Sequence, residues 1–121
     1  FTLVFRRLSQ ALCGDATKAR ELFNDPDAFD SWIQRWHDRL AREEKTTEAT
    51  AQSMDRVNPI YIPRNHKVEE AISSAVDKED MGLFNNLLAV LSHPFDEVVG
   101  NEAYAEPAPF AAIPYKTFCG T

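Results

Sequence analysis

The segment NDPDAFDSWIQRWHDRLAREE, residues 24–44, carries the clearest amphipathic helix pattern in this chain. Asp25 stands where a helix N-cap accepts backbone N–H groups, and Pro26 suits the first turn because its missing N–H would be unpaired there. Apolar residues recur on one helix face at spacings of three and four: Phe29, Trp32, Ile33, Trp36 and Leu40. Each such side chain stabilises a fold by about 1.5–3 kcal/mol when fully buried, so this face predicts a sizeable helix-packing contact.

The residues before this segment predict two more helices. The first covers residues 1–12, ends at Gly14, and places five apolar residues on one face: Phe1, Val4, Phe5, Leu8 and Leu12. Asp15 is placed to cap a short second helix that runs through Leu22 and Phe23. The three helices together predict a helical core at the start of the chain.

Three further helical stretches follow residue 44. Residues 47–56 predict a weak helix, and stronger patterns follow Asn65, a good cap, and Asp80, which is able to cap the last helix before Pro94. The acidic joint between the two stronger helices favours an antiparallel helical hairpin. Their predicted buried stripes are Val68, Ala71, Ile72, Ala75 and Val76 in one, and Met81, Phe84, Leu87, Leu88 and Leu91 in the other.

Two segments do not read as regular helix. In Asn58–Asn65, Pro59 and Pro63 push the preceding residues toward extended geometry, while the apolar residues between them predict docking against the helices. Residues 94–121 mix prolines with aromatic side chains, which indicates an extended tail that docks along a surface. The predicted fold is therefore all-α, with roughly five helices in a helical region over 1–93 and an extended Pro/aromatic tail over 94–121.

Composition restricts the function classes. The 121 residues suffice for one domain with a modest core, and the formal net charge of −6 argues against a nucleic-acid partner, which needs a basic surface. No apolar run is long enough to span a bilayer, so no membrane partner is expected. Two cysteines are too few for a disulfide scaffold, and a reducing compartment is expected. The opening FTLVFRRLSQAL begins with Phe and is already in a helix pattern, so we expect the chain to be a segment of a longer protein.

The sequence predicts no metal, catalytic or nucleotide-binding residue in this chain. The three histidines, His37, His66 and His93, lie far apart, and DPDAFD at 25–30 lacks the glycine and closing glutamate of a calcium loop. Neither a nucleophile elbow nor a glycine-rich phosphate loop is present. The Trp32/Trp36 stripe is expected in the core rather than on a ligand. Three arginines could bind an anion: Arg6, Arg7 and Arg64. The simpler interpretation is that they are exposed and solvate the surface.

Cys119, in the terminal PYKTFCGT, is the one residue with a candidate chemical role. A reactive cysteine needs exposure and a lowered thiol pKa, and Lys116 is the cation nearest in sequence. An inert terminal thiol explains the same residue equally well. A disulfide with Cys13 is a third alternative, although sequence alone does not give the Cα separation that it requires.

Four stretches together resemble the selenoprotein O family: FTLVFRRLSQAL, MDRVNPIYIPRNHKVEEAI, LLAVLSHPFDE and PYKTFCGT. The resemblance extends from Phe1 to Thr121, and its specific parts are the N-P-x-Y-x-x-R-N element and a cysteine third from the end. It implies the C-terminal helical part of a kinase-like fold in a protein adenylyltransferase. Such enzymes transfer AMP from ATP, bound with Mg or Mn, to Ser, Thr or Tyr hydroxyls of protein substrates.

The resemblance also implies where the chemistry lies. The nucleotide, metal and base residues belong to the kinase-like core upstream, so no catalytic residue is carried over to this chain. Cys119 occupies the family's selenocysteine or cysteine position, which implies a redox-regulatory role and a disulfide to a cysteine of the core. The ending CGT differs from other members, so only the cysteine and its position are specific. A cysteine at that position favours bacterial cytoplasm over mitochondrion.

The sequence thus predicts a catalytically inert fragment whose partner is the upstream core of the same protein. The alternative is a free-standing helical interaction module that binds through the aromatic stripe or the tail. Apolar residues that would face the core, among them Phe1, Phe5 and the tail aromatics, also predict that the isolated fragment self-associates.

Overall fold

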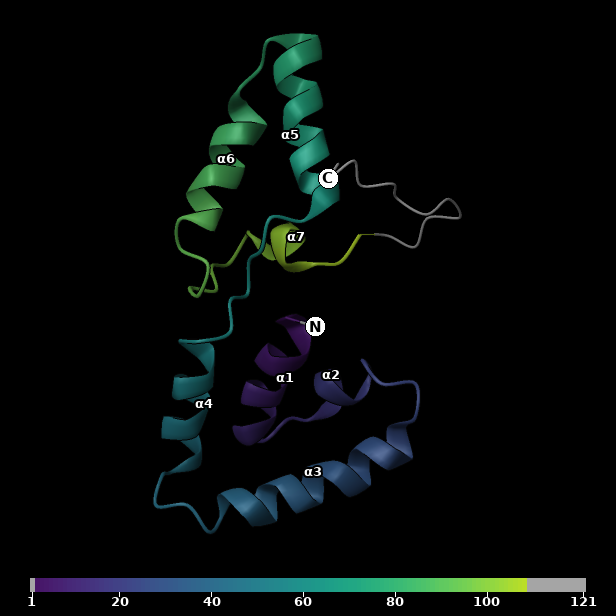
Figure 1. The fold of residues 1–121 in the computed structure, drawn as a ribbon, viewed down its shortest axis with the longest axis vertical. Helices are drawn as coiled ribbons and strands as arrows, with labels where there is room; N and C mark the ends of the chain where they lie inside the picture. Colours follow the sequence, from purple (N-terminus) through teal and green to yellow (C-terminus); the bar gives the residue numbers. More distant parts are fainter. Residues whose placement is uncertain (1, 109–121) are drawn as a thin grey trace, which may run out of the picture. The chain divides into compact units, whose positions relative to one another are not determined.

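The computed structural model describes residues 2–108, so that Phe1 and residues 109–121 lie outside the described part of the chain. Residues 2–108 form seven helices and no strand, which confirms the predicted all-α class (Figure 1). The helices are α1 (Thr2–Leu12), α2 (Thr17–Arg20), α3 (Pro26–Leu40), α4 (Thr47–Asp55), α5 (Asn65–Lys78), α6 (Gly82–Leu91) and α7 (Glu102–Ala105). Two of them, α2 and α7, are single turns of four residues. The predicted short second helix is α2, which ends at Arg20 rather than running through Leu22 and Phe23, and α7 was not predicted.

The described residues divide into two compact units. One holds residues 2–61 together with 93–97, and the other holds residues 62–92 together with 98–108. The division falls inside the proline-flanked segment that the sequence marks as non-helical. The predicted tail region 94–121 reaches beyond residue 108, and the division into 1–93 and 94–121 stays a prediction.

The first unit is built on α1, α2 and α3. Its core cluster consists of Leu8, Ala11, Ala19, Phe29 and Ile33, with Val4, Phe5, Ala16, Trp36 and Met54 packed partly buried against it. The apolar face of α3 is only half covered, because Phe29 and Ile33 are buried while Trp32 is 38% exposed. Asp25 caps α3 as predicted and accepts the Ala28 N–H at 2.9 Å, with Pro26 at the helix start.

The non-helical segment before α5 is anchored by main-chain hydrogen bonds. Ile60 and Tyr61 are 1% and 2% exposed, and both N–H groups donate to the Pro94 carbonyl, at 2.8 and 3.2 Å. These two residues are therefore buried, as predicted, and the partner that their N–H groups reach is the turn at Pro94 rather than a helix.

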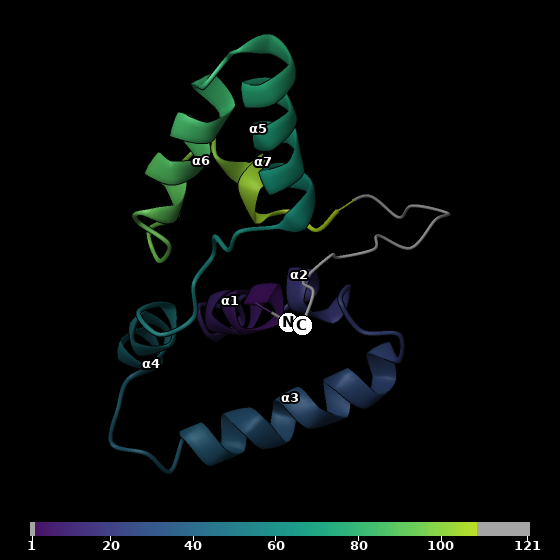
Figure 2. The ribbon, with the colours of Figure 1, turned by 45° about the horizontal axis from the view of Figure 1, so that its top comes forward.

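In the second unit, α5 and α6 lie side by side and antiparallel (Figures 1 and 2), as predicted. Glu79 ends α5 in the left-handed region, with φ of 53°, and the Asp80 carboxylate accepts the Gly82 N–H at 2.8 Å. Asn65 is the first helical residue rather than the cap, because Arg64 takes the N-cap position without a side-chain hydrogen bond. The next short helix, α7, falls within the segment predicted as extended.

The prediction of which residues the hairpin buries was partly wrong. Contact between α5 and α6 buries Ala71, Ser74, Leu87 and Val90, but several residues of the predicted buried stripes are exposed: Ile72, Val76, Met81, Phe84 and Leu88. The physical reason is that each helix has a single long partner, which covers only part of an apolar arc. Within residues 2–108, no helix combines the length and apolar character needed to cross a membrane.

Candidate functional site

The candidate redox residue Cys119 lies outside the described residues, so its surroundings and its disulfide partner stay predictions. Cys13 follows α1 and is exposed with a free thiol.

The structure assigns capping and pairing roles to the acidic segment at the start of α3. Asp25 is the cap, and Arg20 contacts the other two carboxylates, with Nε 3.0 Å from Asp30 Oδ1 and Nη2 3.6 Å from Asp27 Oδ1. The hydrogen bond from Arg20 to Asp30 raises the pKa of the guanidinium. His93 Nδ1 lies 3.8 Å from Asp96 Oδ2, and both side chains are largely exposed. No three His, Cys, Asp or Glu side chains gather as metal ligands within residues 2–108.

The prediction that Arg6 solvates a surface is wrong, because its side chain is only 6% exposed. Its Nη1 donates to the main-chain carbonyls of Asp55, at 3.2 Å, and of Phe95, at 3.3 Å. The same guanidinium pairs with Asp55 Oδ1 at 3.3 Å and with Glu97 Oε2 at 3.4 Å. Ser9 donates its hydroxyl hydrogen bond to Asp55 Oδ1. We call these four side chains the Arg6 cluster.

The Arg6 cluster joins three pieces of the first unit: α1, the end of α4, and residues 93–97. One cation faces two carboxylates, and its donors already meet four oxygen atoms, so the guanidinium is committed to holding the chain rather than to binding an external anion. Arg6 lies about 160° around α1 from Leu8, at about 100° per residue. A small residue on that second face, Ser9, is the sequence signal that could have indicated close packing there.

The other two arginines differ from Arg6. Arg7 donates to Gln10 Oε1 at 2.8 Å within α1. Arg64 donates through Nη2 to the Ala105 carbonyl of α7, and its buried Nε has no hydrogen-bond partner among the described residues. Partial burial lowers the pKa of the Arg64 guanidinium. This side chain fastens α7 to the start of α5.

An apolar groove of about 440 Å³ lies between α1, the segment after α2, and α3. Its walls are Val4, Phe5, Leu8, Phe23, Ala28, Phe29 and Trp32, with Asn24 and Asp25 also contributing. The ring centroids of Phe23 and Phe29 lie 4.7 Å apart in a stacked arrangement, and those of Trp32 and Trp36 lie 5.5 Å apart. The aromatic stripe of α3 therefore lies partly in the core, at Phe29, and partly in the wall of the groove, at Trp32. The groove can accommodate apolar side chains.

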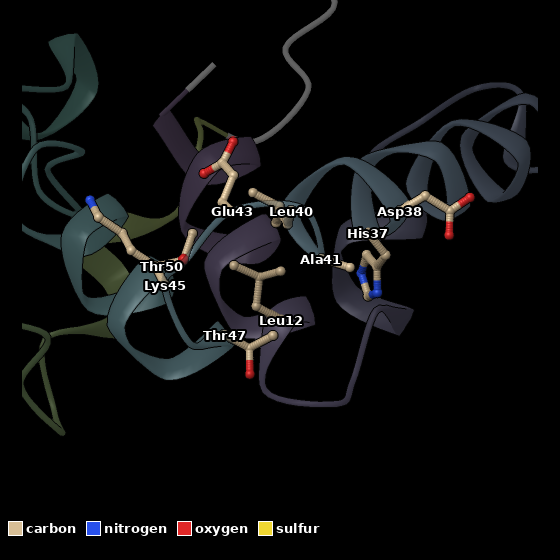
Figure 3. A pocket seen from close by; sticks show the side chains of 9 residues that line it. All are labelled: Leu12, His37, Asp38, Leu40, Ala41, Glu43, Lys45, Thr47 and Thr50. Atoms are coloured by element: carbon tan, nitrogen blue, oxygen red, sulfur yellow. The ribbon is translucent and has the colours of Figure 1, made fainter.

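A second hollow, of about 370 Å³, lies between the end of α3 and the start of α4 (Figure 3). Its lining residues are Leu12, His37, Asp38, Leu40, Ala41, Glu43, Lys45, Thr47 and Thr50. In Figure 3 the charged groups of Asp38, Glu43 and Lys45 point in different directions and not toward a common point. This arrangement assembles no general acid, base or nucleophile around one reacting atom.

These features describe a helical packing segment with an apolar groove, and comparison with known proteins gives its family. The profile of "Protein adenylyltransferase SelO" matches residues 2–92, so the chain belongs to the SelO family. This confirms the resemblance drawn from the sequence.

Curated relatives extend the match to the whole chain. A "Protein nucleotidyltransferase YdiU" of Rhodopseudomonas palustris is 50% identical over 123 residues, and one of a Bradyrhizobium species is 47% identical over 122. A third, from Rhizobium johnstonii, is 47% identical over 124 residues. Each alignment covers 100% of this chain and 25% of the relative, so the chain spans about a quarter of the length of the curated relatives it matches.

Proposed function

We propose that this chain is the C-terminal helical part of a protein adenylyltransferase and that it supports the catalytic core without contributing a catalytic residue. The observation that carries the proposal is the family match over residues 2–92, together with relatives that are about four times as long as this chain. Those relatives have ample additional chain for a nucleotide site. In the intact enzyme, AMP passes from ATP to a Ser, Thr or Tyr hydroxyl of a protein substrate, and pyrophosphate leaves.

The residues of this chain fit a supporting role. The Arg6 cluster fixes three chain segments through one buried cation, and Arg64 fastens α7 to α5. A buried guanidinium held by several oxygen acceptors, as that of Arg6 is, favours one arrangement of the backbone over others. In this proposal, ATP and the Mg or Mn ion are bound by residues of the kinase-like core outside this chain.

A thermal-shift experiment tests where the nucleotide binds. Mg-ATP should leave the melting temperature of this 121-residue chain unchanged and raise that of the full-length protein, because a ligand stabilises only the fold that binds it. At a ligand concentration 100 times Kd, the linkage amounts to about 2.7 kcal/mol. A clear shift in the isolated chain would contradict the placement of the nucleotide site.

We further propose that Cys119 regulates the enzyme through a disulfide with a cysteine of the core. Forming the bond joins the two Sγ atoms, and two electrons and two protons pass to a small disulfide such as oxidised glutathione. The family position of Cys119 supports the proposal, and exposed disulfides are typically the reducible, regulatory ones.

The test of Cys119 uses the full-length protein. AMP transfer by the wild type should change when reductant is added, and Cys119→Ser should remove that response. Cys13→Ser is the matched control and should respond as the wild type does, because Cys13 has no part in the proposed bond. A Cys119→Ser enzyme with an unaltered redox response would overturn the proposal.

The alternative function is a helical interaction module, which the exposed apolar groove favours. A module of that kind would bind its partner equally well without the remaining three quarters of the family protein.

Self-association of the isolated chain, expected from Phe5 and the tail aromatics, is measured by sedimentation over a range of concentrations. The bacterial relatives support a cytoplasmic location in a bacterium.

A further inference from the structure

The hairpin of α5 and α6 exposes a set of large apolar side chains. Their exposed fractions range from 43% for Leu83 and Phe84 to 73% for Val76. Ile72, Val76, Phe84 and Leu88 form what we call the hairpin patch, and Met81 and Leu83 are exposed as well. Single exposed apolar residues are ordinary on a protein surface, but a contiguous group indicates an interaction site.

Helix geometry places the central members of the hairpin patch on one face. At about 100° per residue, Ile72 and Val76 lie about 100° and 140° around α5 from the buried Ala71. Phe84 and Leu88 lie about 60° and 100° around α6 from the buried Leu87, in the same rotational sense. Because the two helices are antiparallel and face each other through Ala71 and Leu87, equal rotations turn both pairs to the same side of the hairpin.

The sequence of α6 is itself typical of a helix with more than one covered side. Gly82–Leu91 has only two polar side chains, Asn85 and Asn86, yet only Leu87 and Val90 of this helix are buried, each 8% exposed. A helix that is apolar on most of its circumference is normally buried in a larger protein. The apolar arc therefore exceeds what the partner helix covers.

We propose that the hairpin patch packs against the part of the family protein that lies outside this chain. The curated relatives are about four times as long as the chain, and longer chains bury a larger fraction of their surface. Because the patch is apolar, the surface that covers it is expected to be apolar as well. The proposal rests on the proposed function in one respect, that this chain folds as part of a longer enzyme.

Hydroxyl-radical footprinting read by mass spectrometry tests the proposal without altering the sequence. In the 121-residue chain alone, Ile72, Phe84 and Leu88 should be modified readily, and in the full-length protein their modification should fall several-fold. Ile60, which is 1% exposed, serves as the internal reference and should be modified slowly in both.

Three other outcomes would overturn the proposal. Equal modification in both proteins would mean that the patch stays open. Protection in the isolated chain that grows with concentration would identify a second copy as the occupant. Protection in the isolated chain at every concentration would identify another segment of the chain itself.

Substitution gives a second, independent readout. Ile72→Gln with Leu88→Gln removes apolar area from the patch and retains side chains that favour helices. The full-length protein should lose at least about 2 °C in melting temperature, while the isolated chain should change little because these side chains are exposed in it. Val99→Gln is the matched control, since Val99 is 96% exposed and lies outside the patch. Equal effects of the double variant on both proteins would contradict the proposal.

The proposed function is tested separately, by the thermal-shift experiment with Mg-ATP. A shift in the melting temperature of the isolated chain would refute the proposed function and leave the result on the hairpin patch standing.

Discussion

Replacing Arg6 by methionine tests whether the Arg6 cluster holds the first unit together. Methionine retains an unbranched apolar side chain, so the variant removes the charge and the donors while limiting the loss of packing volume. It leaves the carbonyls of Asp55 and Phe95 without their donors, and the carboxylates of Asp55 and Glu97 without their cation.

The magnitude follows from the exposure of each partner. Two carbonyl bonds from a charged donor, at 3.2 and 3.3 Å, contribute about 1–1.5 kcal/mol each, near the lower end for charged hydrogen bonds. Asp55 and Glu97 are 39% and 48% exposed, so water can solvate their carboxylates and each ion pair adds only about 0.5 kcal/mol. The expected loss in the free energy of unfolding is about 3 kcal/mol.

Urea denaturation of the chain, followed by far-ultraviolet circular dichroism, measures this loss. Arg7→Met is the matched control: its donor contacts Gln10 one turn away on the same helix, so a loss below about 0.5 kcal/mol is expected. Equal losses for Arg6→Met and Arg7→Met would refute the reasoning that the buried guanidinium links α1, α4 and residues 93–97.

Two further predictions concern local backbone and charge. Glu79→Gly should raise the free energy of unfolding by about 0.5–1 kcal/mol, because glycine adopts the left-handed conformation at φ of 53° without steric cost; Ser73→Gly, inside α5, should lower it by a similar amount. Urea denaturation checks both, and a loss of stability in Glu79→Gly would contradict the conformational argument. Hydrogen bonds from backbone N–H groups lower the pKa of Asp15, Glu48 and Glu102, so the unfolded chain binds more protons in acid. Their stabilisation should be complete above about pH 5 and be lost as the pH falls below the usual values of 3.8 and 4.5. Asp15→Asn should weaken the acid dependence in denaturation experiments between pH 3 and 6 (roughly the titration range of carboxyl groups), and an unchanged profile would rule out the contribution of Asp15.

Local signals were sufficient to predict α1 to α6, but not α7, which lies in the segment expected to be extended. The start of α3 follows from Asp25 and Pro26, whose effects act within one helical turn. The hairpin of α5 and α6 follows from two apolar periodicities and a short acidic joint. The left-handed residue that ends α5 was not predictable, because Glu79 is not the glycine that usually marks this position.

Long-range contacts explain what the sequence did not predict. Arg6 is buried because Asp55 and Glu97, 49 and 91 residues away in the chain, meet its guanidinium. Pairing over such separations depends on the tertiary fold and leaves no local pattern. Periodicity likewise marked Ile72 and Leu88 as apolar-face residues, but how much of an apolar arc is covered depends on the number of neighbouring helices. The groove between α1 and α3 was not predictable for the same reason. Trp32 lies on the same apolar stripe as the buried Phe29, but only the tertiary fold decides which of the two is covered.

The central proposal is that the full-length protein transfers AMP to proteins and that this chain only supports the catalytic core. The most direct measurement incubates the full-length protein and the isolated chain with ATP labelled in either the α- or the γ-phosphate. The account predicts stable transfer of the α-label to Ser, Thr or Tyr side chains by the full-length protein, no transfer of the γ-label, and no transfer of either by the isolated chain. Transfer of the γ-label by the full-length protein, or of the α-label by the isolated chain, would contradict it.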